Sequence, residues 1–137
     1  MFKHITPIQL RFNDVDRLGH VNNNAYFAYY DIGKEKYLHD VLKVDYVEGS
    51  IVPVIAHIET DFFAPIFYGD DVEIHTRVSH LGTKSFTLEQ EAVSLKDGSV
   101  KCRCSTVMVC FDKKTQGSVP FPEEYKKAVL DFEGEIK

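Results

Sequence analysis

Acidic and amide side chains gather with one glycine and one histidine near the start of the chain. They lie in the run Arg11-Phe12-Asn13-Asp14-Val15-Asp16-Arg17-Leu18-Gly19-His20-Val21-Asn22-Asn23-Asn24-Ala25-Tyr26. A strand-like pattern leads into this run, and helical spacing begins as it ends. A carboxylate in the loop and exposed N–H groups at the helix start can act on one bound carbonyl from two sides. The residue types therefore predict a reactive corner.

The residues of this corner each have a structural interpretation as well. Asp14 and Asp16 are residue types that shape turns by accepting backbone N–H groups. Asn22 and Asn23 are good N-cap residues, so their side chains can be structural while a backbone N–H is functional. His20 lies four residues after Asp16 and can orient the acid or a water, or serve the loop alone. The residue types by themselves do not choose between these roles.

The elements around the corner are a strand and a long helix. We expect a strand over residues 5–12, with Pro7 at an edge or entry position. A helix over 24–42 follows from apolar residues that recur every three or four positions. Gly33 on this face lets the backbone come close to its cover. The predicted core face is Tyr26, Tyr30, Gly33, Tyr37 and Val41, and the solvated face is Asp31, Lys34, Glu35 and Lys36.

The rest of the chain has the pattern of strands joined by short turns. We expect strands over 51–63, 72–81, 84–95 and 99–111, an antiparallel meander of these four, and a short helix over 122–130. The fold class is α+β, with a five-stranded antiparallel sheet on one long helix and a single domain over 1–137. The open sheet edges predict a homo-oligomer, either a dimer or a tetramer.

Composition limits the function classes. A chain of 137 residues with 44% hydrophobic residues fits one modest core, and a net charge of -5 argues against nucleic-acid binding. No segment has the length of a signal peptide core or a membrane span, so we expect a cytoplasmic protein without membrane contact. Cys102, Cys104 and Cys110 fall on one face of one strand and predict buried free thiols. The six histidines lack the His-Glu-x-x-His spacing of zinc hydrolases, and we expect no metal.

The motif resembles a known family. Asp14-x-Asp16-x-x-Gly19-His20-Val21-Asn22-Asn23, with Tyr26 close behind, is similar to the active-site segment of hotdog-fold acyl-CoA thioesterases of the 4-hydroxybenzoyl-CoA thioesterase type. Phe62-x-x-Pro65-x-x-x-Gly69-Asp70 and Phe121-Pro122-Glu123-Glu124 extend the resemblance over almost the whole chain. The Gly-His-Val-Asn-Asn form also resembles acyl-ACP thioesterases, which share the fold.

The resemblance implies a hotdog fold, in which the sheet wraps around the long helix. It also implies a dimer formed by edge-strand pairing, with active sites at the subunit interface. Asp16 matches the catalytic carboxylate, which attacks the thioester or activates water, and the backbone N–H of Asn23, with Asn24 close by, polarises the carbonyl. His20 completes the catalytic candidates.

Substrate-binding candidates complete the expected site. The helix and the following strand would shape the acyl pocket, and the hairpin after residue 81 would meet the nucleotide or pantetheine of CoA. These candidates are Asn24, Tyr26, Tyr30, Phe62, Lys84 and Ser85. The expected substrate is an acyl-CoA or acyl-ACP, and no cofactor is needed beyond the CoA of the substrate.

Two other functions stay open at this level. A hotdog hydratase or dehydratase would act on enoyl or hydroxyacyl thioesters, although its motif separates acid and histidine by five positions rather than the four between Asp16 and His20. A non-catalytic acyl-thioester binder is the third alternative. No Gly-x-Ser-x-Gly nucleophile elbow is present to support a serine hydrolase.

Overall fold

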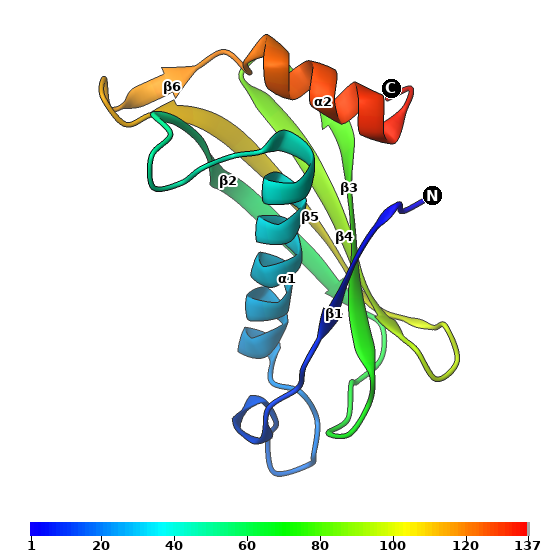
Figure 1. Ribbon diagram of the computed structural model, residues 1–137. Coiled ribbons are helices and arrows are strands. Elements are labelled where there is room, and N and C mark those ends of the chain that lie inside the picture. The colour runs from blue at the N-terminus through cyan, green and yellow to red at the C-terminus, as the bar shows by residue number, and fades with distance from the viewer. Residues whose placement is uncertain (137) are drawn as a thin grey trace.

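One long helix lies against an antiparallel sheet that curves around it in the computed structural model, which describes residues 1–136 (Figure 1). A 3-10 turn, Phe12–Asp14, comes before the long helix, and a π-helical turn, Leu38–Leu42, extends it. The strands and helices are β1 (His4–Ile8), α1 (Asn23–Tyr37), β2 (Ile51–Phe62), β3 (Val72–Leu81), β4 (Ser85–Ser94), β5 (Val100–Asp112), β6 (Gly117–Val119) and α2 (Glu123–Glu133).

The strand order is β1-β3-β4-β5-β2, and the short β6 pairs with the end of β5 as a sixth strand that the sequence did not predict. The predicted meander of four strands is therefore wrong in one respect. β3, β4 and β5 follow one another as hairpins, but β2 pairs with β5 and not with β3. The segment 63–71 between β2 and β3 is too long for a tight hairpin, and it hydrogen-bonds to the loop before α1 through Ile66. β2 consequently forms one edge of the sheet.

The first strand is shorter than predicted. It ends at Ile8 and not at residue 12, because the Asp14 carboxylate accepts the backbone N–H of Arg11 and closes the 3-10 turn. β1 forms the other edge of the sheet, and Pro7 lies within it as an edge position permits.

The predicted core face of α1 is confirmed. Its three tyrosines are at most 3% exposed, and a Cβ on Gly33 would lie 2.6 Å from Ile74 Cγ2 on β3, so glycine permits this close approach. Lys34 was predicted to be solvated and is instead 4% exposed. It follows Tyr30 by one helical turn, so its stem lies along the covered face while Nζ reaches Asp31 Oδ1 at 3.4 Å.

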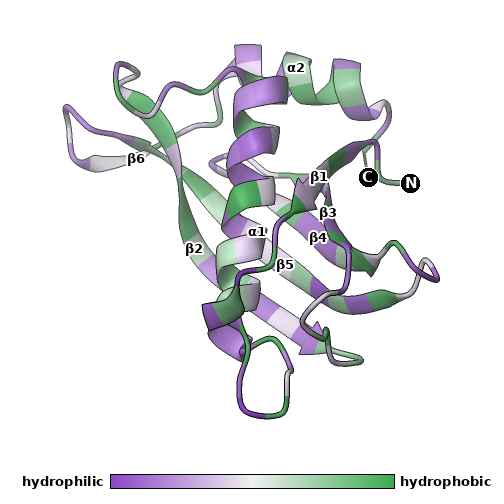
Figure 2. Ribbon diagram, turned by 60° about the horizontal axis from the view of Figure 1, so that its bottom comes forward, coloured by the Kyte–Doolittle hydropathy of each residue, from purple (hydrophilic) through white to green (hydrophobic). Residues whose placement is uncertain are grey.

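The core has two parts, each beneath one half of α1. One contains the tyrosines at the start of α1 with Cys102 and Cys104, and the other contains Tyr37, the π-helical turn, Cys110 and residues of α2. The three cysteines are buried and free, as predicted. In Figure 2 hydrophobic and hydrophilic residues alternate along the strands beneath α1.

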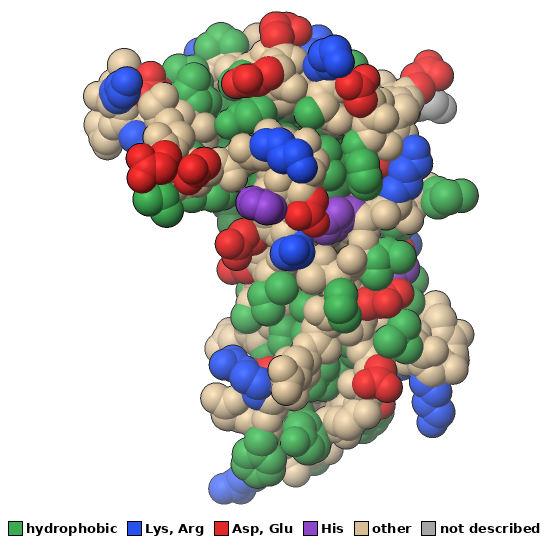
Figure 3. Space-filling view, viewed as in Figure 1, with side chains coloured by type: hydrophobic (Ala, Val, Ile, Leu, Met, Phe, Trp, Pro, Cys, Tyr) green, Lys and Arg blue, Asp and Glu red, His purple; other side chains and the backbone are tan. Residues whose placement is uncertain are grey.

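Charged side chains of both signs are scattered over the face of the molecule in Figure 3, and hydrophobic side chains are exposed at its lower end. Phe12, Leu18 and Tyr68, which lie in or beside the loop before α1, are each more than half exposed. Across residues 1–136, no helix has both the length and the apolar character needed to cross a membrane.

Candidate active site

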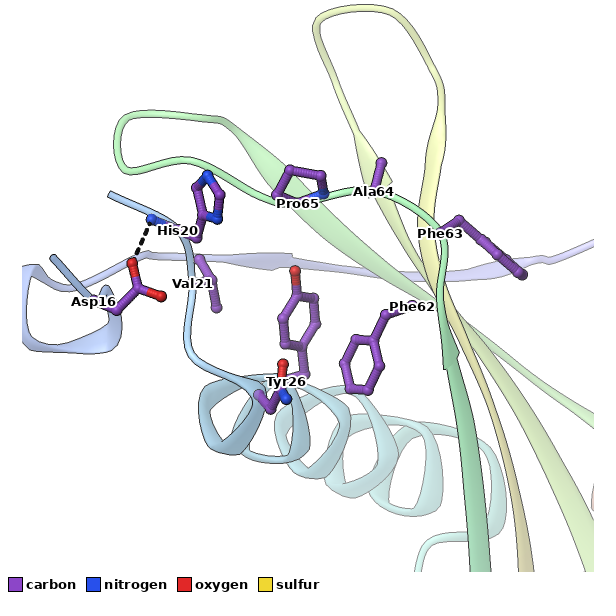
Figure 4. Close-up of a pocket in the computed structure, with 9 residues that line it drawn as sticks. Asp16, His20, Val21, Tyr26, Phe62, Phe63, Ala64 and Pro65 are labelled. Atoms are coloured by element: carbon purple, nitrogen blue, oxygen red, sulfur yellow. Dashed lines mark hydrogen bonds between the residues drawn. The ribbon is translucent and has the colours of Figure 1, made fainter. Parts of the chain in front are cut away.

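A cavity of about 320 Å³ opens at the N-terminal end of α1, where the loop before α1 meets the segment after β2 (Figure 4). We call it the site cavity. A second cavity of about 360 Å³, the asparagine cavity, adjoins it and is lined by Asp16, Val21 and Asn22 to Asn24. Asp16 and Asn23 line both. The site cavity is lined by Asp16, His20, Val21, Asn23, Tyr26, Phe62, Phe63, Ala64 and Pro65.

The Asp16 carboxylate is held through one of its two oxygens. Asp16 Oδ1 accepts the backbone N–H of Leu18 at 2.8 Å and that of His20 at 3.2 Å, which is an Asx turn. Asp16 Oδ2 accepts no hydrogen bond from the part of the chain that the structure describes. The side chain is exposed and lines the cavity. One oxygen thus fixes the carboxylate while the other is available to a ligand.

Backbone hydrogen bonds hold the loop itself. The N–H of Asp16 donates to the carbonyl of His20 at 2.8 Å, and the N–H of Asn22 donates to the carbonyl of Asp14 at 2.8 Å. Gly19 lies in the turn that the first of these hydrogen bonds closes, with a φ of +78°, a conformation that suits glycine. The loop therefore places Asp16 beside the first residue of α1.

The start of α1 offers free donors. Asn22 occupies the N-cap position, but its side chain makes no capping hydrogen bond, so the structural alternative left open for this side chain is not observed. Ala25 N–H donates to the Asn22 carbonyl, whereas the N–H groups of Asn23 and Asn24 have no acceptor among residues 1–136. Unpaired N–H groups at a helix N-terminus attract a developing negative charge. Asn23 borders both cavities, so its donor lies beside Asp16.

Asp14 shapes the turn, as its structural interpretation predicted. Its carboxylate is 5% exposed and accepts the Arg11 N–H at 3.0 Å and the Tyr29 hydroxyl at 2.8 Å. Burial alone raises the pKa of Asp14, but the hydrogen bonds from Arg11 and Tyr29 outweigh it and lower the pKa below its ordinary value. Asp14 is thus an ionised support beneath the loop, with no contact to either cavity.

The ring of His20 contacts Phe67 and not the Asp16 carboxylate. It packs against Phe67 edge to face at 4.8 Å between ring centroids, and in Figure 4 it points away from the Asp16 carboxylate. The contact with Asp16 comes from the His20 backbone N–H. His20 lines the site cavity as a wall residue in this arrangement.

Tyr26 and Phe62 form the apolar wall, with ring centroids 5.0 Å apart. The Tyr26 hydroxyl accepts the backbone N–H of Ile66 at 3.3 Å, which joins α1 to the segment after β2. Ala64 and Pro65 also line the cavity and were not among the candidates. Both lie within three residues of Phe62, inside the Phe62-x-x-Pro65 motif, and this spacing was the signal that could have found them.

Three candidates lie away from the cavity in this chain. Tyr30 is fully buried, and its hydroxyl donates to Cys102 Sγ at 2.8 Å. Lys84 and Ser85 come after the C-terminal end of β3. The N-terminal end of β3 is the end that follows the cavity-lining residues 62–65. The ten residues of β3 separate them from the cavity by about 30 Å.

Other catalytic groups are not assembled here. Burial raises the pKa of the Cys102 and Cys110 thiols to about 11, so neither is a thiolate nucleophile at neutral pH. Among the described residues no group of three or more histidine, cysteine, aspartate or glutamate side chains could hold a metal ion. Asp16 carries the one carboxylate among the residues that line the site cavity.

The sheet wrapped around α1, with a cavity at the helix N-terminus, defines a hotdog fold of the thioesterase type. Residues 10–129 match the model of the thioesterase-like superfamily, and the chain belongs to that family.

Three individual proteins show what the chain is similar to. A thioesterase from Thermus thermophilus, solved with coenzyme A and zinc, superposes with a TM-score of 0.85 at 28% identity, covering 98% of this chain and 97% of that one. The uncharacterized protein YsmA of Bacillus subtilis is 24% identical over 94% of this chain and 86% of its own length. The 1,4-dihydroxy-2-naphthoyl-CoA hydrolase of Synechocystis is 23% identical over 62% of each chain.

Proposed function

We propose that this protein hydrolyses an acyl-CoA thioester to a carboxylic acid and free CoA. The observation that carries the proposal is that one cavity is lined by both Asp16 and Asn23, and that neither Asp16 Oδ2 nor the Asn23 N–H has a hydrogen-bond partner among residues 1–136. Membership of the thioesterase-like superfamily supports thioester hydrolysis as the reaction.

The geometry suits attack on a thioester carbonyl. With the carbonyl oxygen directed at the Asn23 and Asn24 N–H groups, Asp16 Oδ2 approaches the carbonyl carbon or removes a proton from an attacking water. Negative charge on the carbonyl oxygen is stabilised by the N–H donors, each typically worth about 10²–10³ in kcat. The C–S bond then breaks, and the sulfur leaves as thiolate. When Asp16 acts as the base, the thiolate takes up the proton that Asp16 removed from water. When Asp16 is the nucleophile, the thiolate takes up a proton from water, and a water molecule then hydrolyses the acyl-Asp16 anhydride to release the acid. Both routes use the same carboxylate.

Coenzyme A is the proposed carrier. The Thermus thermophilus thioesterase was solved with coenzyme A, and the Synechocystis relative bears the name of a CoA-thioester hydrolase. An acyl carrier protein is the alternative carrier. The acyl group would lie against the aromatic wall of Tyr26 and Phe62.

A homodimer would complete the site. β2 is an edge strand, and Val54, Ile55 and Phe62 on it are 38–47% exposed. Antiparallel pairing of two β2 strands about their middle would place the Val54 end of one strand near the Phe62 end of the other. Ser85 and Val54 both pair with Val109, so they share a row across the sheet. The pairing would therefore bring Lys84 and Ser85 toward the cavity of the second copy.

The test is thiol release from a panel of short, medium, long and aromatic acyl-CoA thioesters, with the corresponding acyl-ACP substrates in parallel. Release of CoA from at least one acyl-CoA supports the proposal. Loss of enoyl absorbance from crotonyl-CoA without thiol release would instead indicate a hydratase. Saturable CoA binding with no turnover of any substrate would indicate a binding protein.

A further inference from the structure

We propose that Tyr29 is a positioning residue of the thioesterase reaction, which it serves by holding the Asp16 loop in place through Asp14. The inference rests on the proposed function, because that function gives Asp16 and the Asn23 N–H their roles. Tyr29 touches neither cavity and takes no part in bond making or breaking.

The contact that carries this inference is buried. The Tyr29 hydroxyl donates to Asp14 Oδ2 at 2.8 Å, with Tyr29 3% and Asp14 5% exposed. Within residues 1–136, this is the one side-chain hydrogen bond that joins residues 11–20 to α1. Arg11 supplies the other donors to Asp14, from its backbone N–H at 3.0 Å and from Nη2 at 3.1 Å.

Asp14 is in turn linked to the groups that the proposed function uses. The Asp14 carbonyl accepts the N–H of Asn22, the residue directly before the proposed donors, and Asp16 lies two residues further along the loop. Tyr29 lies six residues inside α1, about 9 Å along the axis from Asn23. Asp14 is therefore tied at once to the interior of the helix, to its N-cap and to the loop that carries the carboxylate.

The relative position of these groups decides the rate. A bound carbonyl must lie about 3 Å from both the attacking atom and the donors, and a misplacement of about 1 Å can lower the rate about 10²-fold. Without the Tyr29 hydroxyl, Asp14 Oδ2 keeps only the Arg11 N–H, and that donor belongs to the same turn. The loop then loses its side-chain attachment to the helix.

The experiment compares Tyr29→Phe with Tyr37→Phe as a matched control. Tyr37 is also a buried tyrosine of α1 whose hydroxyl donates to a carboxylate, that of Glu133 on α2 at 2.6 Å, and it lies at the opposite half of the helix. Both variants lose one buried hydroxyl and its charge-assisted bond. Steady-state kinetics on the best acyl-CoA and thermal unfolding would be measured for both.

We expect Tyr29→Phe to lower kcat by about tenfold or more with KM changed less than about threefold, because the positioning acts on the transition state. Tyr37→Phe should keep kcat within about twofold of wild type, although its melting temperature should fall about as much as that of Tyr29→Phe. If Tyr29→Phe does not fold, Asp14→Asn provides a second variant, for which we expect the same loss of kcat.

Equal kcat values for Tyr29→Phe and Tyr37→Phe would overturn the inference, as would a Tyr29→Phe defect confined to KM. Asp16→Asn in the same assay separates this failure from failure of the proposed function. If Asp16→Asn is inactive while Tyr29→Phe matches its control, Tyr29 is structural only. If Asp16→Asn retains wild-type turnover, the proposed roles are wrong and the inference falls with them.

Discussion

The backbone N–H of His20 donates to Asp16 Oδ1 at 3.2 Å, while the ring of His20 packs on Phe67. The histidine therefore supports the carboxylate through an atom that every residue other than proline possesses. The ring itself forms part of the cavity wall.

Replacing His20 with alanine should accordingly have a small effect. The backbone donor remains in His20→Ala, so Asp16 should keep its orientation, and we expect kcat to fall less than about tenfold. A general acid or base typically contributes about 10²–10⁴ in rate. Steady-state kinetics that show a loss of 10² or more would assign the ring a direct role in proton transfer.

Gly33→Ala should destabilise the fold. The added Cβ would lie 2.6 Å from Ile74 Cγ2 and 3.1 Å from Gln90 Nε2, and overpacking of this kind costs about 1–3 kcal/mol. Urea unfolding would measure the change in the free energy of unfolding. Gly117→Ala is the control, since its nearest neighbour would be 3.9 Å away and its φ is not positive. Equal stability of the two variants would refute the close approach of α1 to β3.

Asp14 should make stability depend on acid pH. Its pKa in the folded protein is lower than its ordinary value of 3.8, so the ionised form stabilises the fold above that value, and this contribution is lost as pH falls through the lowered pKa. Asp14→Asn should be less stable than wild type at neutral pH, with a gap that stays constant down to about pH 5 and narrows below about pH 4. Urea titrations across this range would show it, and a gap that widens in acid would contradict the assignment.

Lys84→Ala tests whether a second copy completes the site. If Lys84 meets a phosphate of CoA, KM for an acyl-CoA should rise about fivefold or more, while KM for the matching acyl-pantetheine, which lacks the nucleotide, should stay within about twofold. Lys126→Ala, on the exposed side of α2, serves as the charge-matched control. The same rise for both substrates would remove Lys84 from nucleotide binding.

Local spacing predicted much of the fold. The buried helical face of Tyr26, Tyr30 and Tyr37 and the limits of β3 were predicted correctly. Both follow from the spacing of apolar residues that are close together in the sequence. The partner of β2 could not be found this way, since strand order depends on where the segment 63–71 is held. The burial of Lys34 was not predicted because lysine is counted as a charged residue, although its long apolar stem can be buried.

Most of the candidate residues lie together at one end of the molecule. Asp16, His20, Asn23, Tyr26 and Phe62 line one cavity. The sequence did not reveal that His20 acts through its backbone or that Asn22 leaves the helix start uncapped, since both depend on side-chain directions set by the folded loop. The hydrogen bond from Tyr29 to Asp14 joins residues on two elements, and it too could be found only from the structure.

The most direct test of the central claim is the turnover of Asp16→Asn with the best acyl-CoA substrate. An asparagine Oδ1 can accept the same Leu18 and His20 N–H groups, so the Asx turn is kept while the reactive oxygen is replaced by an amide nitrogen. We expect kcat to fall by about 10³-fold or more with the melting temperature close to wild type. Turnover within about tenfold of wild type in the folded variant would contradict the account.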